Sequence, residues 1–452
     1  MSLAKRRRRR IVVVLALGAA TCYGYAVVQS ERELRAELAS APEPATVSLH
    51  SALAAGGEAA EASAELRTAS TRIAAFQAFF SRMGRSGAMD TVVRFHSRLR
   101  EEPYPTLTPS EKDEIRAAIG VLQPELAELR ELVRGGGPVA VLDFLQQLDT
   151  DEKHLEHLKA CAALLRLDLI VQIEAGNSAT AREDVVAGLE LAAILAREPY
   201  LFAHLERWRM IQALRDTLQR DCALDHFATE DLEAIIIVLA GAKHREEFVA
   251  MLQSERLRGI YGFDRMVKAG WRERVALADQ MFQGNRDVFW AGTYLYLSPL
   301  CRIRHNREMV SHGRLLGLAA DAALLPYYEA KAQWDKIESG YDDATLGMLC
   351  FSYGPRIRLI DEQQAGCEAD LDLMRLGLGL ALYHRERGVY PESLVELSHL
   401  LGGALPRDPY SGEHYRYKRD SDGGIAAYSV NWNLRDDGGN EEDHLDTVWC
   451  AG

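Results

Sequence analysis

The N-terminal stretch constrains this chain most, because it decides on which side of a membrane the rest would fold. Residues 5–10 are six consecutive cations, and the next 18 residues, 11–28, carry no charge. As a helix, 18 residues span about 27 Å, close to the ~30 Å hydrocarbon core of a bilayer. Because a cationic flank stays cytoplasmic, the sequence predicts a cytoplasmic tail at 1–10 and a signal anchor at 11–28 that contacts the lipid bilayer. The predicted location is the inner (cytoplasmic) membrane, single-pass, with a periplasmic or otherwise extracytoplasmic bulk.

Two other interpretations of this stretch stay open. A cleaved signal peptide has an apolar core of about 7–15 residues and then a small-residue cleavage site, whereas this run is longer and residues 24–26 and 26–28 make poor sites. Residues 19–22 are similar to a lipoprotein cleavage box, although Thr21 does not suit one. Anchor and signal peptide both export the rest of the chain, and no later run is long and apolar enough to span again.

Charge and cysteine spacing exclude several classes of protein. The net charge of −13, less the six cations, leaves −19 for residues 11–452. Nucleic-acid binding needs a basic face, so we expect no nucleic-acid partner. The seven cysteines form no C-x-x-C pair, which argues against a zinc ribbon or a thioredoxin-type motif. Cys350 with Cys367, or Cys161 with Cys222, could form a disulfide in an exported compartment, and buried free thiols are the alternative.

The middle of the chain has helical periodicity. Residues 29–62, rich in Ala, Pro, Gly, Ser and Glu after a short helical start, are predicted to be a tether. Residues 63–365 are predicted to be an α-helical body, in which Thr108 starts one helix and Gly176 ends another. Helices joined by short turns predict an irregular array of antiparallel helical hairpins. Expected helices include 151–174, 180–197, 200–221, 230–240, 244–257, 302–325, 327–339 and 368–387.

After Gly388 the spacing of apolar residues changes from the helical period to the two-residue alternation of β-strands. Alternation predicts strands at 414–418, 425–430 and 446–449, with a hairpin turn at 420–424. The expected fold class is therefore mainly α, with an N-terminal membrane helix, the helical-hairpin array, and a small C-terminal α+β antiparallel module at 366–452.

The tail carries a series of short motifs. They are Gly388-Val389-Tyr390-Pro391, Leu405-Pro406-Arg407-Asp408-Pro409-Tyr410-Ser411-Gly412, Tyr415-Arg416-Tyr417, Tyr428-Ser429-Val430, and Asp436-Asp437-Gly438-Gly439 leading to Asp446-Thr447-Val448-Trp449. Together they resemble the C-terminal half of the major pseudopilins of type II secretion. The tail is also similar to that of uncharacterised exported helical proteins known from planctomycetes. Pseudopilins begin with a processed leader and an apolar helix bearing Glu, which a poly-Arg flank and an acid-free helix replace here. The resemblance thus implies a borrowed module rather than a filament subunit.

In pseudopilins the loop before the last strand binds calcium, so the resemblance implies calcium as a cofactor here. Calcium takes six to eight oxygen ligands, which a Gly-bearing acidic loop can supply. Asn431 and Leu434 stand where these tails often have Gly, and a solvated acidic loop is the alternative. The ligands that the resemblance implies are Asp436, Asp437, Asp446 and, more weakly, Ser429 and backbone carbonyls near Leu434.

No catalytic motif appears in a fitting context. His154 and His157, three residues apart on a helix, could share a metal, but two surface histidines on a charged face are the simpler interpretation. His305 and His312 lie among arginines. A basic helix face packed on acidic neighbours is the simpler interpretation there, and contact with an anion or a lipid headgroup is the alternative.

The resulting hypothesis is a non-enzymatic, membrane-anchored helical scaffold that binds envelope proteins, such as secretion or pilus components. An envelope hydrolase or polymer-binding enzyme, with its site in the aromatic-rich region 259–300, is the alternative. A third interpretation is an exported subunit of a cell-surface assembly, which cleavage after the apolar run would favour.

Overall fold

The computed structural model describes residues 23–41, 64–101, 107–134, 153–219, 223–268, 302–340, 357–420, 423–440 and 446–451. An N-terminal helix covers residues 23–40. The other elements are α3 (Ala64–Met83), α4 (Gly87–Glu101), α5 (Pro109–Val121), α6 (Gln123–Val133), α7 (Lys153–Ala175), α8 (Ser178–Ala196), α9 (Leu201–Leu218), η1 (Ala223–His226), α10 (Thr229–Ala240), α11 (Arg245–Lys268), α14 (Arg302–Ala323), α15 (Tyr327–Gly340), α17 (Ile357–Arg387), η4 (Leu394–Leu397), β1 (Arg416–Arg419), β2 (Ile425–Ser429) and β3 (Thr447–Ala451).

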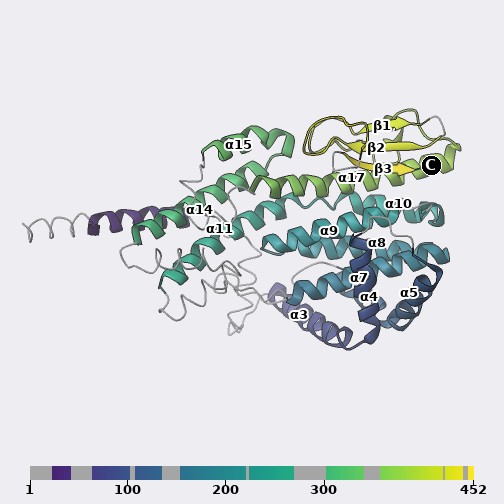
Figure 1. Ribbon diagram of the computed structural model, residues 1–452, viewed down its shortest axis with the longest axis horizontal. Coiled ribbons are helices and arrows are strands. Elements are labelled where there is room, and N and C mark those ends of the chain that lie inside the picture. Colours follow the sequence, from purple (N-terminus) through teal and green to yellow (C-terminus); the bar gives the residue numbers. More distant parts are fainter. Residues whose placement is uncertain are drawn as a thin grey trace, which may run out of the picture.

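The described residues are mainly helical and end in a small antiparallel sheet, which confirms the coarse fold class (Figure 1). The sheet covers one side of the long helix α17, and α9 and α10 pack on the other side. Beyond them follow α7 and α8, and then α3, α4 and α5. Because α17 begins at Ile357, the predicted boundary at residue 365 falls inside one continuous helix.

Helix starts and stops follow local chemistry. Thr108 caps α5 and Glu111 bonds back to it, so the predicted capping box is present. Helix α7 ends at Gly176, whose φ of 72° suits a residue without Cβ. The amide of Asn177 then donates to the carbonyl of Gln172 at 2.9 Å, which satisfies a terminal acceptor.

Two apolar clusters fill the interior, and α17 belongs to both. Its first half packs with α11, α14 and α15, and its second half packs with α3–α10 and the sheet. Cys161 and Cys367 are buried free thiols, as the second alternative has it, while Cys222 and Cys350 lie outside the described residues. Burial explains this chemistry, because it favours the neutral thiol and raises the pKa of Cys367 to about 12.

The strands lie in the order β1-β2-β3, all antiparallel, with Ala427 of β2 opposite both Tyr417 and Trp449. The sheet is part of a C-terminal module, by which we mean residues 388–451. Trp449 is 1% exposed and stands over Gly377 of α17. A Cβ at Gly377 would lie 2.0 Å from Cε2 of the indole, so the contact requires glycine.

One prediction is corrected at the N-terminus. Within the described ranges, no helix is both long and apolar enough to cross a membrane, which overturns the predicted single-pass inner-membrane location. Residues 11–22 of the predicted span, and 42–62 of the predicted tether, lie outside the described residues.

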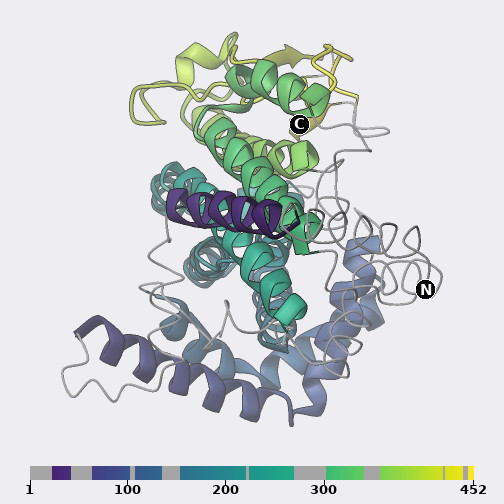
Figure 2. The ribbon, with the colours of Figure 1, turned by 90° about the vertical axis from the view of Figure 1, so that its left-hand side faces the viewer.

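The N-terminal helix packs on protein instead, beside α11 and α14 (Figure 2). Glu37 is 8% exposed and accepts a hydrogen bond from Nη2 of Arg256 at 2.5 Å. The amide of Asn306 donates to Oγ of buried Ser30 at 3.0 Å. Buried ionic and polar side chains of this kind need protein partners, so residues 29–40 belong to the body.

Candidate functional site

The four predicted metal ligands lie in or beside the loop between β2 and β3, here called the acidic loop (residues 431–446). Asp446 is 2% exposed, and its Oδ2 accepts from the amides of Gly439 and Asn440 at 2.8 and 3.2 Å. Its Oδ1 is buried without a hydrogen-bond partner among the described residues. Burial, and secondarily the nearby charges of Asp437 and Asp436, raise the pKa of Asp446. This carboxylate therefore has an unused acceptor in acidic surroundings.

Asp436 and Asp437 have other partners within the acidic loop. Oδ1 of Asp436 accepts from the hydroxyl of Tyr428 at 2.9 Å and from the amide of Gly438 at 3.1 Å. Oδ2 of Asp437 accepts from the side-chain amide of Asn433 at 2.7 Å. These bonds shape the turn and leave both carboxylates at the surface.

Ser429, the fourth predicted ligand, is turned toward a different carboxylate. Its hydroxyl donates to Oδ1 of Asp408 at 2.9 Å, and Asp408 also accepts from the amides of Tyr410 and Val430 at 2.9 and 3.2 Å. Asp408 is 1% exposed and ties the 405–412 turns to the end of β2. Sequence reasoning missed this role, although an Asp-Pro-x-Ser run is a typical side-chain-to-backbone turn signal.

The described residues of the acidic loop supply only part of a calcium site. An orphaned, buried Asp446 oxygen suits a cation, yet within the described ranges no group of three or more His, Cys, Asp or Glu side chains is placed to hold one. Glu441, Glu442 and Asp443, which could add oxygens, lie outside the described residues. Calcium therefore stays a prediction.

Trp432 is the large apolar side chain of the acidic loop, and it is 52% exposed. The preceding residue, Asn431, has φ 53° and accepts from the amide of Trp432 through its Oδ1 at 2.9 Å. Leu434 also has a positive φ, 57°. Both residues thus adopt the left-handed conformation that glycine favours, and the indole is presented outward on a hydrogen-bonded turn.

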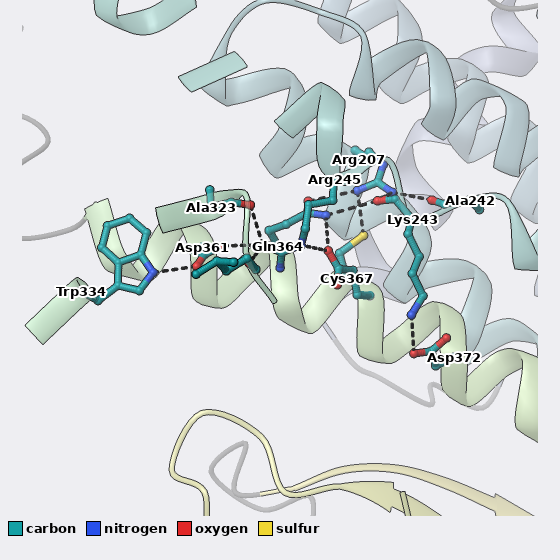
Figure 3. A network of polar contacts seen from close by, with 12 residues as sticks. Arg207, Ala242, Lys243, Arg245, Ala323, Trp334, Asp361, Gln364, Cys367 and Asp372 are labelled. Atoms are coloured by element: carbon teal, nitrogen blue, oxygen red, sulfur yellow. Dashed lines mark hydrogen bonds and ion pairs between the residues drawn. The ribbon is translucent and has the colours of Figure 1, made fainter. Parts of the chain in front are cut away.

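A polar network links α17 to neighbouring helices and to the segment before α11 (Figure 3). Nη1 of Arg207 contacts Sγ of Cys367 at 3.1 Å, and Nε of Arg245 donates to Oε1 of Glu368 at 2.8 Å. Nζ of Lys243 pairs with Oδ2 of Asp372 at 2.9 Å.

The same Asp372 oxygen accepts from the hydroxyl of Tyr415 in the C-terminal module at 3.1 Å. At the other end of the network, Nε1 of Trp334 donates to Asp361 at 2.8 Å. Burial raises the pKa of Asp361 and of Asp372 to about 6. These charges are satisfied by protein groups, so the network stabilises the arrangement of the module and the helices.

A second buried cluster joins α6, α7 and α8. Nη2 of Arg130 lies 2.5 Å from Oδ2 of Asp168 and 2.6 Å from Oδ1 of Asp184, and both carboxylates are 0% exposed. Burial, with Asp168 adding to it, raises the pKa of Asp184 well above its usual value. One guanidinium thus serves two buried carboxylates, an arrangement that disfavours the charged form of Asp184.

The predicted histidine pairs do not form a metal site in the described structure. His154 is buried with Nε2 2.5 Å from the hydroxyl of Tyr200, so its assignment to the surface is wrong, while the ring of His157 stacks on Phe80. His312 is fully buried against Gly259, where burial lowers its pKa to about 4.

The arginines around the second histidine pair contact acidic residues of the N-terminal helix, as the simpler interpretation predicts. Arg302 pairs with Glu31 at 2.6 Å, and Arg314 lies 3.9 Å from Glu37. Most of the aromatic-rich region 259–300, the predicted site of the alternative enzyme, lies outside the described residues. Comparisons with protein-family models, with curated proteins and with solved structures give no match.

Proposed function

We propose that the protein is a non-enzymatic helical scaffold that binds another protein through the acidic loop of its C-terminal module. The observation that carries this proposal is the half-exposed Trp432, held on a turn by Asn431. Tryptophan is enriched among residues that dominate protein–protein binding energy, because it buries a large area at a small entropic cost. Asp436 and Asp437 are exposed in the same loop, and their carboxylates would favour a partner with a basic rim.

The way the module is held supports this proposal. Besides the Trp449 contact with α17, the hydroxyl of Tyr410 donates to the carbonyl of Glu362 at 2.7 Å, and that of Tyr415 donates to Asp372 at 3.1 Å. A binding loop on a preorganised support loses less conformational entropy on association. The helices would therefore serve to position the module.

The resemblance to pseudopilins suggests the class of partner. A helix followed by a three-stranded antiparallel sheet, with an acidic loop before the last strand, is consistent with that resemblance. The left-handed Asn431 and Leu434 replace the glycines common in such tails. On this basis the body is an irregular helical-hairpin array that carries a pseudopilin-like module, and the partner is a component of secretion or pilus-like machinery.

A crosslinked pull-down of the tagged full-length chain from a native extract, read by mass spectrometry, tests the proposal. We expect Trp432→Ser to lose the partner without a change in melting temperature. Ile237→Ser is the matched control, because Ile237 is 74% exposed on α10, outside the module. Recovery of the bait alone, or equal loss of the partner in both variants, would overturn the proposal.

A further inference from the structure

The two edges of the C-terminal sheet differ in what covers them. At the edge formed by β3, the side-chain amide of Gln219, just after α9, donates to the carbonyl of Val448 at 3.2 Å and accepts from the backbone amide of Cys450 at 3.3 Å. A further strand would pair through these same backbone groups, so the end of a helix occupies the β3 edge. The other edge is β1, which lies farther from α17 than β3 does (Figure 1).

The pairing register shows which backbone groups of β1 face outward. In an antiparallel ladder, successive residues direct their N–H and C=O groups to opposite sides of the strand. Across the hairpin turn, the amide of Asp420 donates to the carbonyl of Gly424 at 2.7 Å, so the even-numbered residues of 416–420 face β2. The contacts of β3 described above give the same register. The N–H and C=O groups of Tyr417 and Arg419 therefore point away from the sheet.

This outward side of β1 is unpaired within the part of the chain that the structure describes. No hydrogen bond there joins the outward backbone groups of Tyr417 and Arg419 to another group. The strand itself is fixed in place, because the hydroxyl of Tyr417 donates to the carbonyl of Pro391 at 2.9 Å. A fixed row of unpaired backbone donors and acceptors is a template on which an extended segment can add as a further strand.

The charges of β1 indicate what kind of segment fits. Three of its four residues, Arg416, Lys418 and Arg419, are cations in a chain whose net charge is −13. Arg416 is already paired with carboxylates. Nζ of Lys418 donates to the neutral carbonyl of Gly438 at 2.6 Å, and Arg419 is exposed. Among the described residues, neither of these two cations is matched by a carboxylate, and they lie on opposite faces of the strand.

A second copy of the chain is a poor occupant for this edge, because two β1 strands side by side would bring like charges together. We propose that the edge of β1 binds an extended, acidic segment of another protein, which adds a fourth strand to the sheet. Backbone hydrogen bonds to Tyr417 and Arg419 supply the affinity, and acidic side chains beside Lys418 and Arg419 supply the selectivity. Trp432 takes no part, so the β1 edge and the acidic loop can be tested separately.

Fluorescence anisotropy with labelled peptides and the full-length chain tests the chemistry. The probe is Thr-Glu-Val-Glu-Val-Glu-Thr, and its basic counterpart has Lys at each Glu position. A third peptide keeps the acidic sequence but carries N-methyl groups on adjacent central residues, which blocks backbone pairing on both of its sides. We expect saturable binding of the acidic peptide, and at least tenfold weaker binding of the other two. A dissociation constant above about 1 mM for the acidic peptide, or equal binding of either counterpart, would overturn the proposal.

Two variants of one residue locate the site. Arg419→Pro removes an outward N–H, a change that an edge strand tolerates, and Arg419→Thr is the matched control that removes the same charge but keeps the N–H. We expect at least a tenfold loss of affinity for the acidic peptide in Arg419→Pro and about a twofold to threefold loss in Arg419→Thr, as for one exposed charge.

An equal loss in the two variants would refute backbone pairing at this edge. Dimerisation of the wild type that Arg419→Pro abolishes, measured by sedimentation velocity, would make a second copy the occupant and would also refute the proposal. If Arg419→Pro lowers the melting temperature, the N-methylated peptide decides, because it leaves the protein unchanged.

Discussion

The contact between Trp449 and Gly377 predicts that Gly377→Ala destabilises the wild-type chain but stabilises the Trp449→Ala variant. In the wild-type chain, the methyl group of Gly377→Ala would lie 2.0 Å from Cε2 of the buried indole. The indole has to move, because the new methyl group is attached directly to the backbone of α17 and cannot rotate away. In a Trp449→Ala background, the same methyl group enters empty space.

The magnitudes follow from packing and from helix propensity. Overpacking costs about 1–3 kcal/mol, while replacing glycine by alanine inside a helix gains about 1 kcal/mol. We therefore expect Gly377→Ala to destabilise the wild type by up to about 2 kcal/mol and to stabilise the Trp449→Ala variant by up to about 1 kcal/mol. Trp449→Ala alone should cost about 3–5 kcal/mol, since the side chain is 1% exposed.

Urea unfolding of the four proteins, followed by circular dichroism at the helix band, measures both effects and their coupling energy. Circular dichroism is preferable to indole fluorescence because one substitution removes a tryptophan. If Gly377→Ala stabilised the wild type, or if the two substitutions were additive, the sheet would not rest on α17 through this contact. Gly379→Ala is a milder control, because its Cβ would meet a flexible leucine side chain at 3.1 Å.

Three further predictions follow from buried charges. If Asp446 binds calcium, the metal should raise the melting temperature of the wild type but not of Asp446→Asn, and midpoints that are identical with calcium and with chelator would exclude the site. Because Asp184 has a raised pKa, the folded state keeps a proton that the unfolded state releases, so stability should fall as pH rises above about 4. Asp184→Asn should reduce that slope in urea midpoints between pH 5 and 8, and an unchanged slope would contradict the raised pKa of Asp184. Arg256→Met leaves buried Glu37 with only the exposed Arg314, 3.9 Å away, and should cost up to about 3–5 kcal/mol by thermal unfolding, whereas adding Glu37→Leu should recover most of this loss.

Helix positions in this chain are local properties, and the sequence predicts them well. Thr108 and Glu111 lie three residues apart, which is enough to identify the capping box, and Gly176 is enough to identify a helix end. The strand hairpin is visible for the same reason, because β1 and β2 are joined by a short Gly-bearing turn. Boundaries move where tertiary contacts extend a helix, as at Ile357, which is 1% exposed in the second core cluster.

The candidate site follows the sequence only in part: Asp436, Asp437 and Asp446 accept hydrogen bonds from groups within eight residues of themselves, but Ser429 does not stay within its own loop. The hydroxyl of Ser429 accepts from the amide of Asn431 in the acidic loop, but it donates to Asp408, 21 residues away. Arg130, Asp168 and Asp184 likewise come together from three helices, and no local pattern distinguishes these side chains from an ordinary charged helix face. Spatial neighbours of this kind depend on how helices pack.

The N-terminus shows the same division. Sequence alone determined a charge-free run followed by a charged helical segment, since charge and periodicity are properties of neighbouring residues. Only the tertiary structure decided that Glu37 of that segment is buried against Arg256, 219 residues away. Burial of a charge depends on whether a distant cation reaches it, and that is set by the packing of α11 and α14 around the helix. Local sequence therefore determined the helices and strands of this protein, and the packing of distant segments decided which of its charged side chains are buried in ion pairs.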